Sequence, residues 1–99
     1  MPRKKEKFSR YEVTDYLKSK EELAAYLDAC IEEAGDDAAY ITAALGDVAR
    51  ARGMVQLAKD TGMSREGLYK ALSRDGNPSL ATVLKVVKAL GLKLTAKVA

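Results

Sequence analysis

Apolar residues recur at intervals of three and four along most of the chain, the spacing of a helix with one buried face. This spacing predicts helices over residues 20–34, 38–51 and 54–61, a fourth that begins after Ser64, and a fifth over residues 79–90. The pattern therefore predicts an all-α fold.

Residues that begin and end helices stand at the boundaries of these segments. Ser19 is followed by Glu22 in the S-x-x-E spacing of a capping box, and Asp36 or Asp37 is placed to cap the next helix. The glycines expected to end helices are Gly35, Gly53, Gly62 and Gly91.

The predicted last helix has a broad apolar stripe. Its expected inward residues are Leu80, Val83, Leu84, Val87 and Leu90. This alignment leaves Val86 on the polar face, where it is either an ordinary exposed side chain or a contact for a second copy.

The single cysteine, Cys30, falls on the apolar stripe of the predicted helix over residues 20–34. It is expected to be a small core residue.

The two ends of the chain have different patterns. Residues 1–10 are expected to be a flexible basic arm, and residues 11–99 a single domain. Phe8–Val13 and Leu92–Val98 show period-two alternation, which predicts short terminal strands. A lone strand is unstable, so the C-terminal one would pair either with the N-terminal one or with its equivalent in a second copy.

Composition argues for a binding protein and against an enzyme. The 99 residues contain no histidine and one cysteine, so the commonest general base and the commonest metal ligand are both missing. We therefore expect no catalytic site, no metal and no cofactor. One cysteine and the lack of a long apolar run or a secretory signal favour a cytoplasmic protein without a membrane span.

The net charge of +3 is unevenly distributed along the chain. Residues 1–10 carry +4, residues 11–49 carry −8, and residues 50–99 carry +7. This separation indicates two surfaces with different partners, of which the basic one suits double-stranded DNA.

The basic half contains a helix-turn-helix pattern. Its motif core spans residues 54–73, with Thr61-Gly62-Met63 as the turn, and the helix over residues 79–90 supports it. In such motifs the start of the second helix meets base edges in the major groove. If Leu68 and Leu72 face the core, then the polar residues of this helix face outward, namely Arg65, Glu66, Tyr69 and Lys70.

These outward residues define the predicted DNA-binding site. Arg65 can donate to guanine, Glu66 can accept from cytosine, and the amides after Ser64 can contact a phosphate. Tyr69 and Lys70 can reach a base or a phosphate. The full predicted set is Ser64, Arg65, Glu66, Tyr69, Lys70, Lys59 and Arg74, with Arg50 and Arg52 as further flanking cations.

The sequence resembles two nested families. Residues 53–94, with their Leu-Ala, Gly-x-Ser and Asn-Pro-Ser-Leu landmarks, resemble the lambda-repressor or Xre class of helix-turn-helix domains. The longer strings over residues 43–54 and 64–73, with Asp15-Tyr16-Leu17 and Ala24-Ala25-Tyr26-Leu27, are similar to HigA-type addiction-module antidote proteins.

The resemblance implies an antitoxin that binds a small toxin protein and represses its own operon. It further implies a lambda-repressor-like bundle with an added N-terminal helix, acting as a homodimer on a palindromic operator. One position departs from the class: Met54 stands where many Xre domains have a phosphate-binding glutamine, and Gln56 follows two residues later.

Two alternatives to this role remain open at the level of sequence. One is a freestanding prophage-type repressor without a toxin, and the other is a toxin-neutralising interaction module with little DNA binding. The acidic segment over residues 28–37 likewise has two interpretations. It either receives a basic toxin or forms a solvated helix face followed by a cap.

Overall fold

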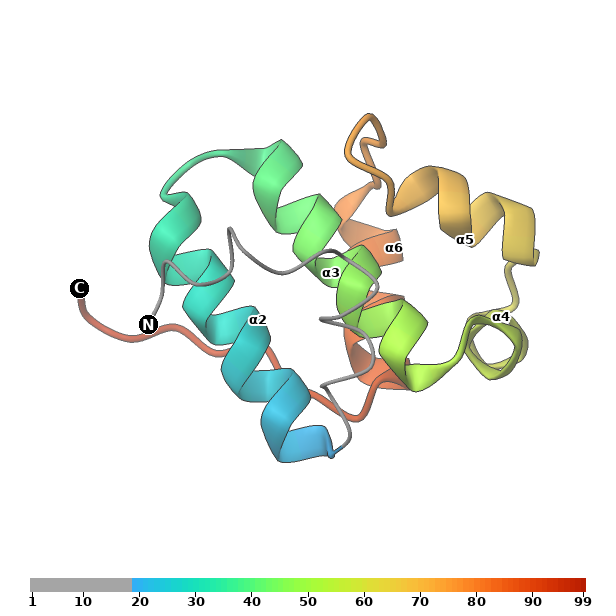
Figure 1. The fold of residues 1–99 in the computed structure, drawn as a ribbon, viewed down its shortest axis with the longest axis horizontal. Helices are drawn as coiled ribbons and strands as arrows, with labels where there is room; N and C mark the ends of the chain where they lie inside the picture. The colour runs from blue at the N-terminus through green and yellow to red at the C-terminus, as the bar shows by residue number, and fades with distance from the viewer. Residues whose placement is uncertain (1–18) are drawn as a thin grey trace.

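The computed structural model describes residues 19–99, and all the regular secondary structure in that range is helical (Figure 1). The helices are α2 (Lys20–Ala34), α3 (Ala38–Arg52), α4 (Met54–Thr61), α5 (Arg65–Ala71) and α6 (Leu80–Ala89). The predicted all-α class is confirmed for this part of the chain, and the helix boundaries agree closely with the hydrophobic pattern. The predicted Phe8–Val13 strand lies outside the described residues.

The predicted caps account for where the helices begin. Ser19 Oγ accepts a hydrogen bond from the Glu22 amide at 3.1 Å, and Glu22 Oε1 accepts one from the Ser19 amide at 3.0 Å, which completes a capping box. Asp37 is the carboxylate that caps α3, accepting from the Tyr40 amide at 3.2 Å. Ser64 and Ser79 cap α5 and α6 in the same way.

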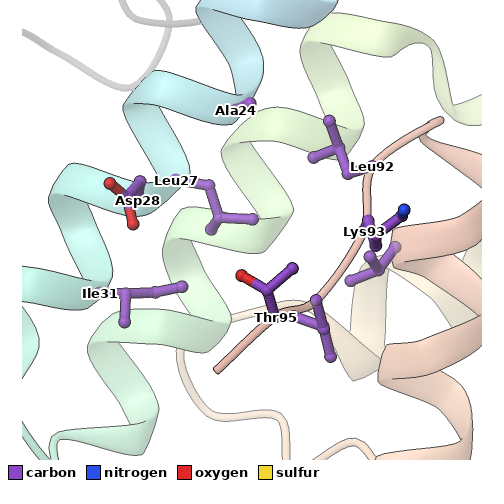
Figure 2. Close-up of a pocket in the computed structure, with 9 residues that line it drawn as sticks. Ala24, Leu27, Asp28, Ile31, Leu92, Lys93 and Thr95 are labelled. Atoms are coloured by element: carbon purple, nitrogen blue, oxygen red, sulfur yellow. The ribbon is translucent and has the colours of Figure 1, made fainter. Parts of the chain in front are cut away.

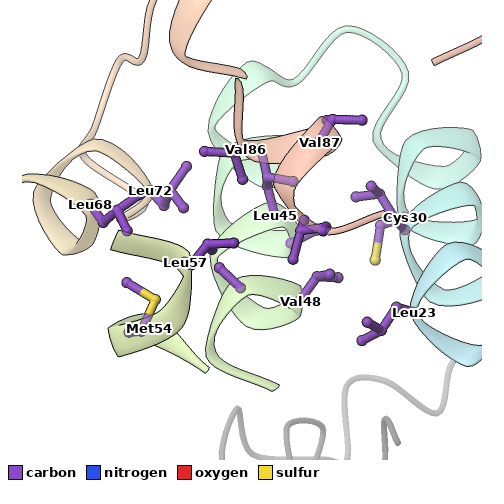
Figure 3. Close-up of a cluster of buried hydrophobic side chains, with 14 residues drawn as sticks. Leu23, Cys30, Leu45, Val48, Met54, Leu57, Leu68, Leu72, Val86 and Val87 are labelled. Atoms are coloured by element: carbon purple, nitrogen blue, oxygen red, sulfur yellow. The ribbon is translucent and has the colours of Figure 1, made fainter. Parts of the chain in front are cut away.

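The core lies where all five described helices meet (Figure 3). α2 packs along α3, whereas α4 contacts α3, α5 and α6. The core residues are Leu23, Leu27, Cys30, Ala44, Leu45, Val48, Ala49, Met54, Leu57, Leu68, Leu72, Val86, Val87 and Leu90. Cys30 is a core residue, as expected. Burial of each fully buried leucine side chain stabilises the fold by roughly 1.5–3 kcal/mol of transfer free energy.

The predicted inward face of the last helix was partly wrong. Val86, expected on the polar face, is fully buried, whereas Leu80 and Leu84 are 70% and 48% exposed. The buried stripe follows the spacing of Val83, Val86, Val87 and Leu90, which turns the helix away from the predicted alignment. Val86 therefore cannot be a surface contact for a second copy.

The predicted C-terminal strand is also wrong for the described structure. Residues 92–99 have no strand conformation, and no strand lies within residues 19–99 to pair with them. Leu92 instead packs partly against the core, and the tail passes α2 (Figure 1).

A buried polar contact joins α2 to α3. Asp47 is only 7% exposed, and its Oδ2 accepts a hydrogen bond from the Tyr26 hydroxyl at 2.8 Å. Its Oδ1 forms an ion pair with the Arg50 guanidinium one turn later on α3. A buried carboxylate is costly without such partners, so these contacts make its position tolerable within the packed bundle.

Tyr26 should make stability depend on pH in the alkaline range. Burial raises the pKa of its hydroxyl above the ordinary value, and the charge of Asp47 and the hydrogen bond to it raise it further. Above about pH 10 the unfolded chain releases this proton and the folded chain retains it, so the free energy of unfolding falls as the pH rises. Tyr26→Phe should abolish this component. Urea denaturation at about pH 9 and pH 11 tests it, because equal pH dependence in both proteins would contradict the assignment.

Candidate nucleic-acid interface

The predicted turn between the two motif helices is present. Gly62 adopts a left-handed conformation with φ of 76°, and its amide donates to the Ala58 carbonyl at 2.9 Å. The Met63 amide donates to the same carbonyl at 3.1 Å, which closes the end of α4. α5 begins three residues after Gly62 with Ser64 as its cap, so the chain redirects within a short and well-bonded segment.

Two leucines fix the rotation of α5. Leu68 is fully buried and Leu72 is 2% exposed, one helical turn apart. Their burial places the opposite side of the helix at the surface, where Arg65, Glu66, Tyr69 and Lys70 are all exposed.

The structure brings most of the predicted residues together. Ser64, Arg65, Glu66 and Tyr69 line one surface depression at the start of α5, and Lys70 is exposed directly after Tyr69. The remaining two residues lie on neighbouring segments: Lys59 is exposed on α4, and Arg74 is exposed after α5.

One flanking cation differs from expectation. Arg50 was grouped with the cations that could contact phosphates, but it is partly buried and paired with Asp47. This pairing was not predicted, although the i, i+3 spacing of Asp47 and Arg50 on one helix favours an ion pair. Arg52, at the end of α3, is exposed.

The structure shows the role of Met54, the residue that departs from the Xre pattern. Met54 is the first residue of α4 and is only 8% exposed, so its side chain belongs to the core. Gln56, two residues later, is exposed and donates from Nε2 to Asp60 Oδ1 at 2.9 Å. The start of α4 therefore contributes packing at the position where many Xre domains have a phosphate-binding glutamine.

Gly67 lies inside α5 and is open on its outer side. A Cβ at this position would meet only the Ser64 hydroxyl, at 3.0 Å, and no atom of a neighbouring helix. The Gly67 amide donates to that same hydroxyl at 2.9 Å. Close packing against another helix therefore does not explain the glycine.

The acidic helix α2 and the predicted recognition helix α5 lie at opposite ends of the described structure. Figure 1 shows α2 at one end and α5 at the other, with α3 and α6 between them. α2 exposes five acidic residues and one lysine, whereas α5 exposes Arg65 and Lys70 beside Glu66. A polyanion would therefore be attracted to the α5 end and repelled from α2.

Within residues 19–99 there is no cluster of metal-binding side chains and no helix that could span a membrane. Three or more His, Cys, Asp or Glu side chains are nowhere gathered there in a way that would hold a metal ion. Over the same residues, the helices are too short or too polar to cross a membrane.

Comparison with known proteins identifies the family. Residues 7–98 match the family described as "Probable addiction module antidote protein". The chain is also similar to an uncharacterized protein of Haemophilus influenzae, with 52% identity over 88 residues that cover 89% of each chain. No solved structure matches the chain. Since the family match spans nearly the whole sequence, the chain belongs to the family of probable addiction module antidote proteins.

Proposed function

We propose that the protein is the antitoxin of a toxin–antitoxin pair and that it represses transcription of its own operon by occupying the promoter. The family description supports the antitoxin part, because an antidote implies a toxin that it neutralises. One structural observation carries the DNA-binding part. Buried Leu68 and Leu72 hold α5 so that its outer face presents polar and basic side chains.

This face has the chemistry that base recognition requires. Arg65 offers a planar fork of donors for guanine O6 and N7, and Glu66 is an acceptor for the cytosine amino group. Lys70, Lys59 and Arg74 are exposed cations on or beside α5, suited to contact the phosphate backbone. Of the predicted set, Arg65 and Glu66 are therefore assigned to bases, and the three other cations to the backbone.

The operator is proposed to be palindromic and bound by a homodimer. A single seven-residue α5 reads only a few base pairs, whereas a dimer places two such helices in successive major grooves about 34–36 Å apart. Repression then requires no chemistry, because the bound dimer excludes RNA polymerase from the promoter.

The proposal is tested with the chain's own promoter and the product of the gene paired with it. We expect the protein to bind the promoter duplex more tightly than a scrambled duplex of equal length, with an affinity that falls steeply as salt rises. We also expect co-expression to restore growth to cells that express the paired gene product.

The two readouts separate the alternatives. Operator binding without growth rescue would favour a freestanding repressor. Growth rescue combined with equally weak binding to both duplexes would favour an interaction module that does not regulate transcription.

A further inference from the structure

A groove runs between α2 and the C-terminal tail, away from α5. Its walls include Leu27, Asp28 and Ile31 from α2 and Leu92, Leu94 and Thr95 from the tail. Figure 2 shows Leu27 and Ile31 pointing from α2 toward the tail. Ile31 is 40% exposed and Leu94 is 48% exposed, so an apolar strip remains accessible at the surface.

The surface beside this groove is acidic. Asp28 lines it, and Glu32 and Glu33 are exposed one turn further along α2. Asp36 and Asp37 are exposed just beyond the end of the helix. Lys93 lines the tail side of the groove and Lys97 is exposed further along the tail, but the five acidic residues outnumber these two cations.

The charge indicates which kind of macromolecule fits. The acidic side chains would repel nucleic acid, whereas a cationic protein surface would gain both long-range attraction and charge-assisted hydrogen bonds. An apolar strip flanked by charge also matches the anatomy of protein interfaces, in which an apolar centre is surrounded by a polar rim.

The position of the groove permits two partners at once. α2 lies at the opposite end of the described structure from α5 (Figure 1), so a protein seated against α2 and the tail leaves the outer face of α5 open. Binding at the groove is therefore compatible with a complex that also contains DNA.

We propose that this groove is the docking site for the toxin, and that the toxin presents a cationic surface with an apolar side chain seated between Ile31 and Leu94. Basic toxin residues then face Asp28 and Glu32 on the α2 side. This inference rests on the proposed antitoxin role and adds the surface and the chemistry of the partner.

The test uses two groove variants, each with a matched control. Ile31→Lys places a charge in the groove, and Ala25→Lys places the same charge on an exposed position of α2 that does not line it. Leu94→Lys is matched in the tail by Val98→Lys, because Val98 is fully exposed. The probe is the purified product of the gene paired with this chain, titrated by calorimetry into each full-length variant.

We expect each groove variant to weaken toxin binding at least about tenfold and each control to change it less than about twofold. Asp28→Asn should reduce the dependence of toxin affinity on salt. Promoter binding should be unchanged in all five variants, which also shows that each one folds.

The outcomes distinguish this inference from the function on which it rests. Unchanged toxin affinity in both groove variants would overturn the docking site while the antitoxin role stands. Failure of the wild-type chain to bind the paired gene product would overturn both. If the groove variants instead convert a free dimer to monomers and bind toxin normally, a second copy covers the groove and the inference is wrong.

Discussion

Arg65→Ala is expected to weaken binding to the cognate operator by roughly 1–3 kcal/mol, which is the contribution of one bidentate arginine–guanine contact. Arg65 is the first residue of α5, and its side chain is exposed beside Glu66 and Tyr69 at one surface depression. Because the contact reads a base, the loss should be largest on the cognate sequence and small on a scrambled duplex. Fluorescence anisotropy with both duplexes measures this difference directly.

Lys70→Ala should have a different signature. A lysine that contacts a phosphate contributes equally on every sequence, so affinity should fall on both duplexes and the salt dependence should decrease by about one unit of slope. The pair of variants thereby separates base recognition from backbone binding on the same helix.

Lys97→Ala is the matched control for both changes. It also removes one exposed positive charge, but from the C-terminal tail, which ends far from α5 (Figure 1). If Lys97→Ala weakens operator binding as much as Arg65→Ala does, net charge explains the affinity and α5 is not the recognition helix.

The hydrophobic pattern predicted the helices because local signals and packing agree in them. Ser19, Asp37, Ser64 and Ser79 each combine a capping side chain with the start of an apolar stripe, and each is a helix cap in the structure. The exposure of the predicted recognition residues followed for the same reason. Once the buried leucines of a short helix are identified, its outward residues are determined.

The errors arose where tertiary contacts decide between similar local choices. Leu80 and Leu84 fit an apolar stripe as well as Val86 does, and the packing of α6 against the other helices selects the buried set. The alternation over residues 92–98 forms a strand only where a partner strand pairs with it, and the pattern alone does not decide whether Phe8–Val13 or a second copy would do so. Likewise, a carboxylate at position 47 gives no local sign that a tyrosine on another helix will bond to it.

A second large effect is expected at Gly46, where one added carbon atom, the Cβ of an alanine, should lower the stability of the fold. It lies in the middle of α3, where a Cβ would be 2.4 Å from the backbone carbonyl oxygen of Leu72. Leu72 is the C-cap of α5, so the backbone of α3 at Gly46 lies close to the end of the proposed recognition helix. The glycine therefore permits a backbone contact that supports the position of α5.

Gly46→Ala should consequently destabilise the fold, although alanine is the better helix former by about 1 kcal/mol. The Leu72 oxygen belongs to the backbone and cannot rotate away, so α3 and α5 must separate, and such overpacking costs roughly 1–3 kcal/mol or more. We expect a net loss of stability in urea denaturation, accompanied by weaker operator binding because α5 shifts.

Gly67→Ala is the control variant, because a Cβ at position 67 meets only a side-chain hydroxyl. The stability of this variant should stay within about 1 kcal/mol of the wild-type value. If Gly46→Ala proves as stable as the wild-type protein, α3 does not approach Leu72 this closely, and the support inferred for α5 must come from Leu68 and Leu72 packing alone.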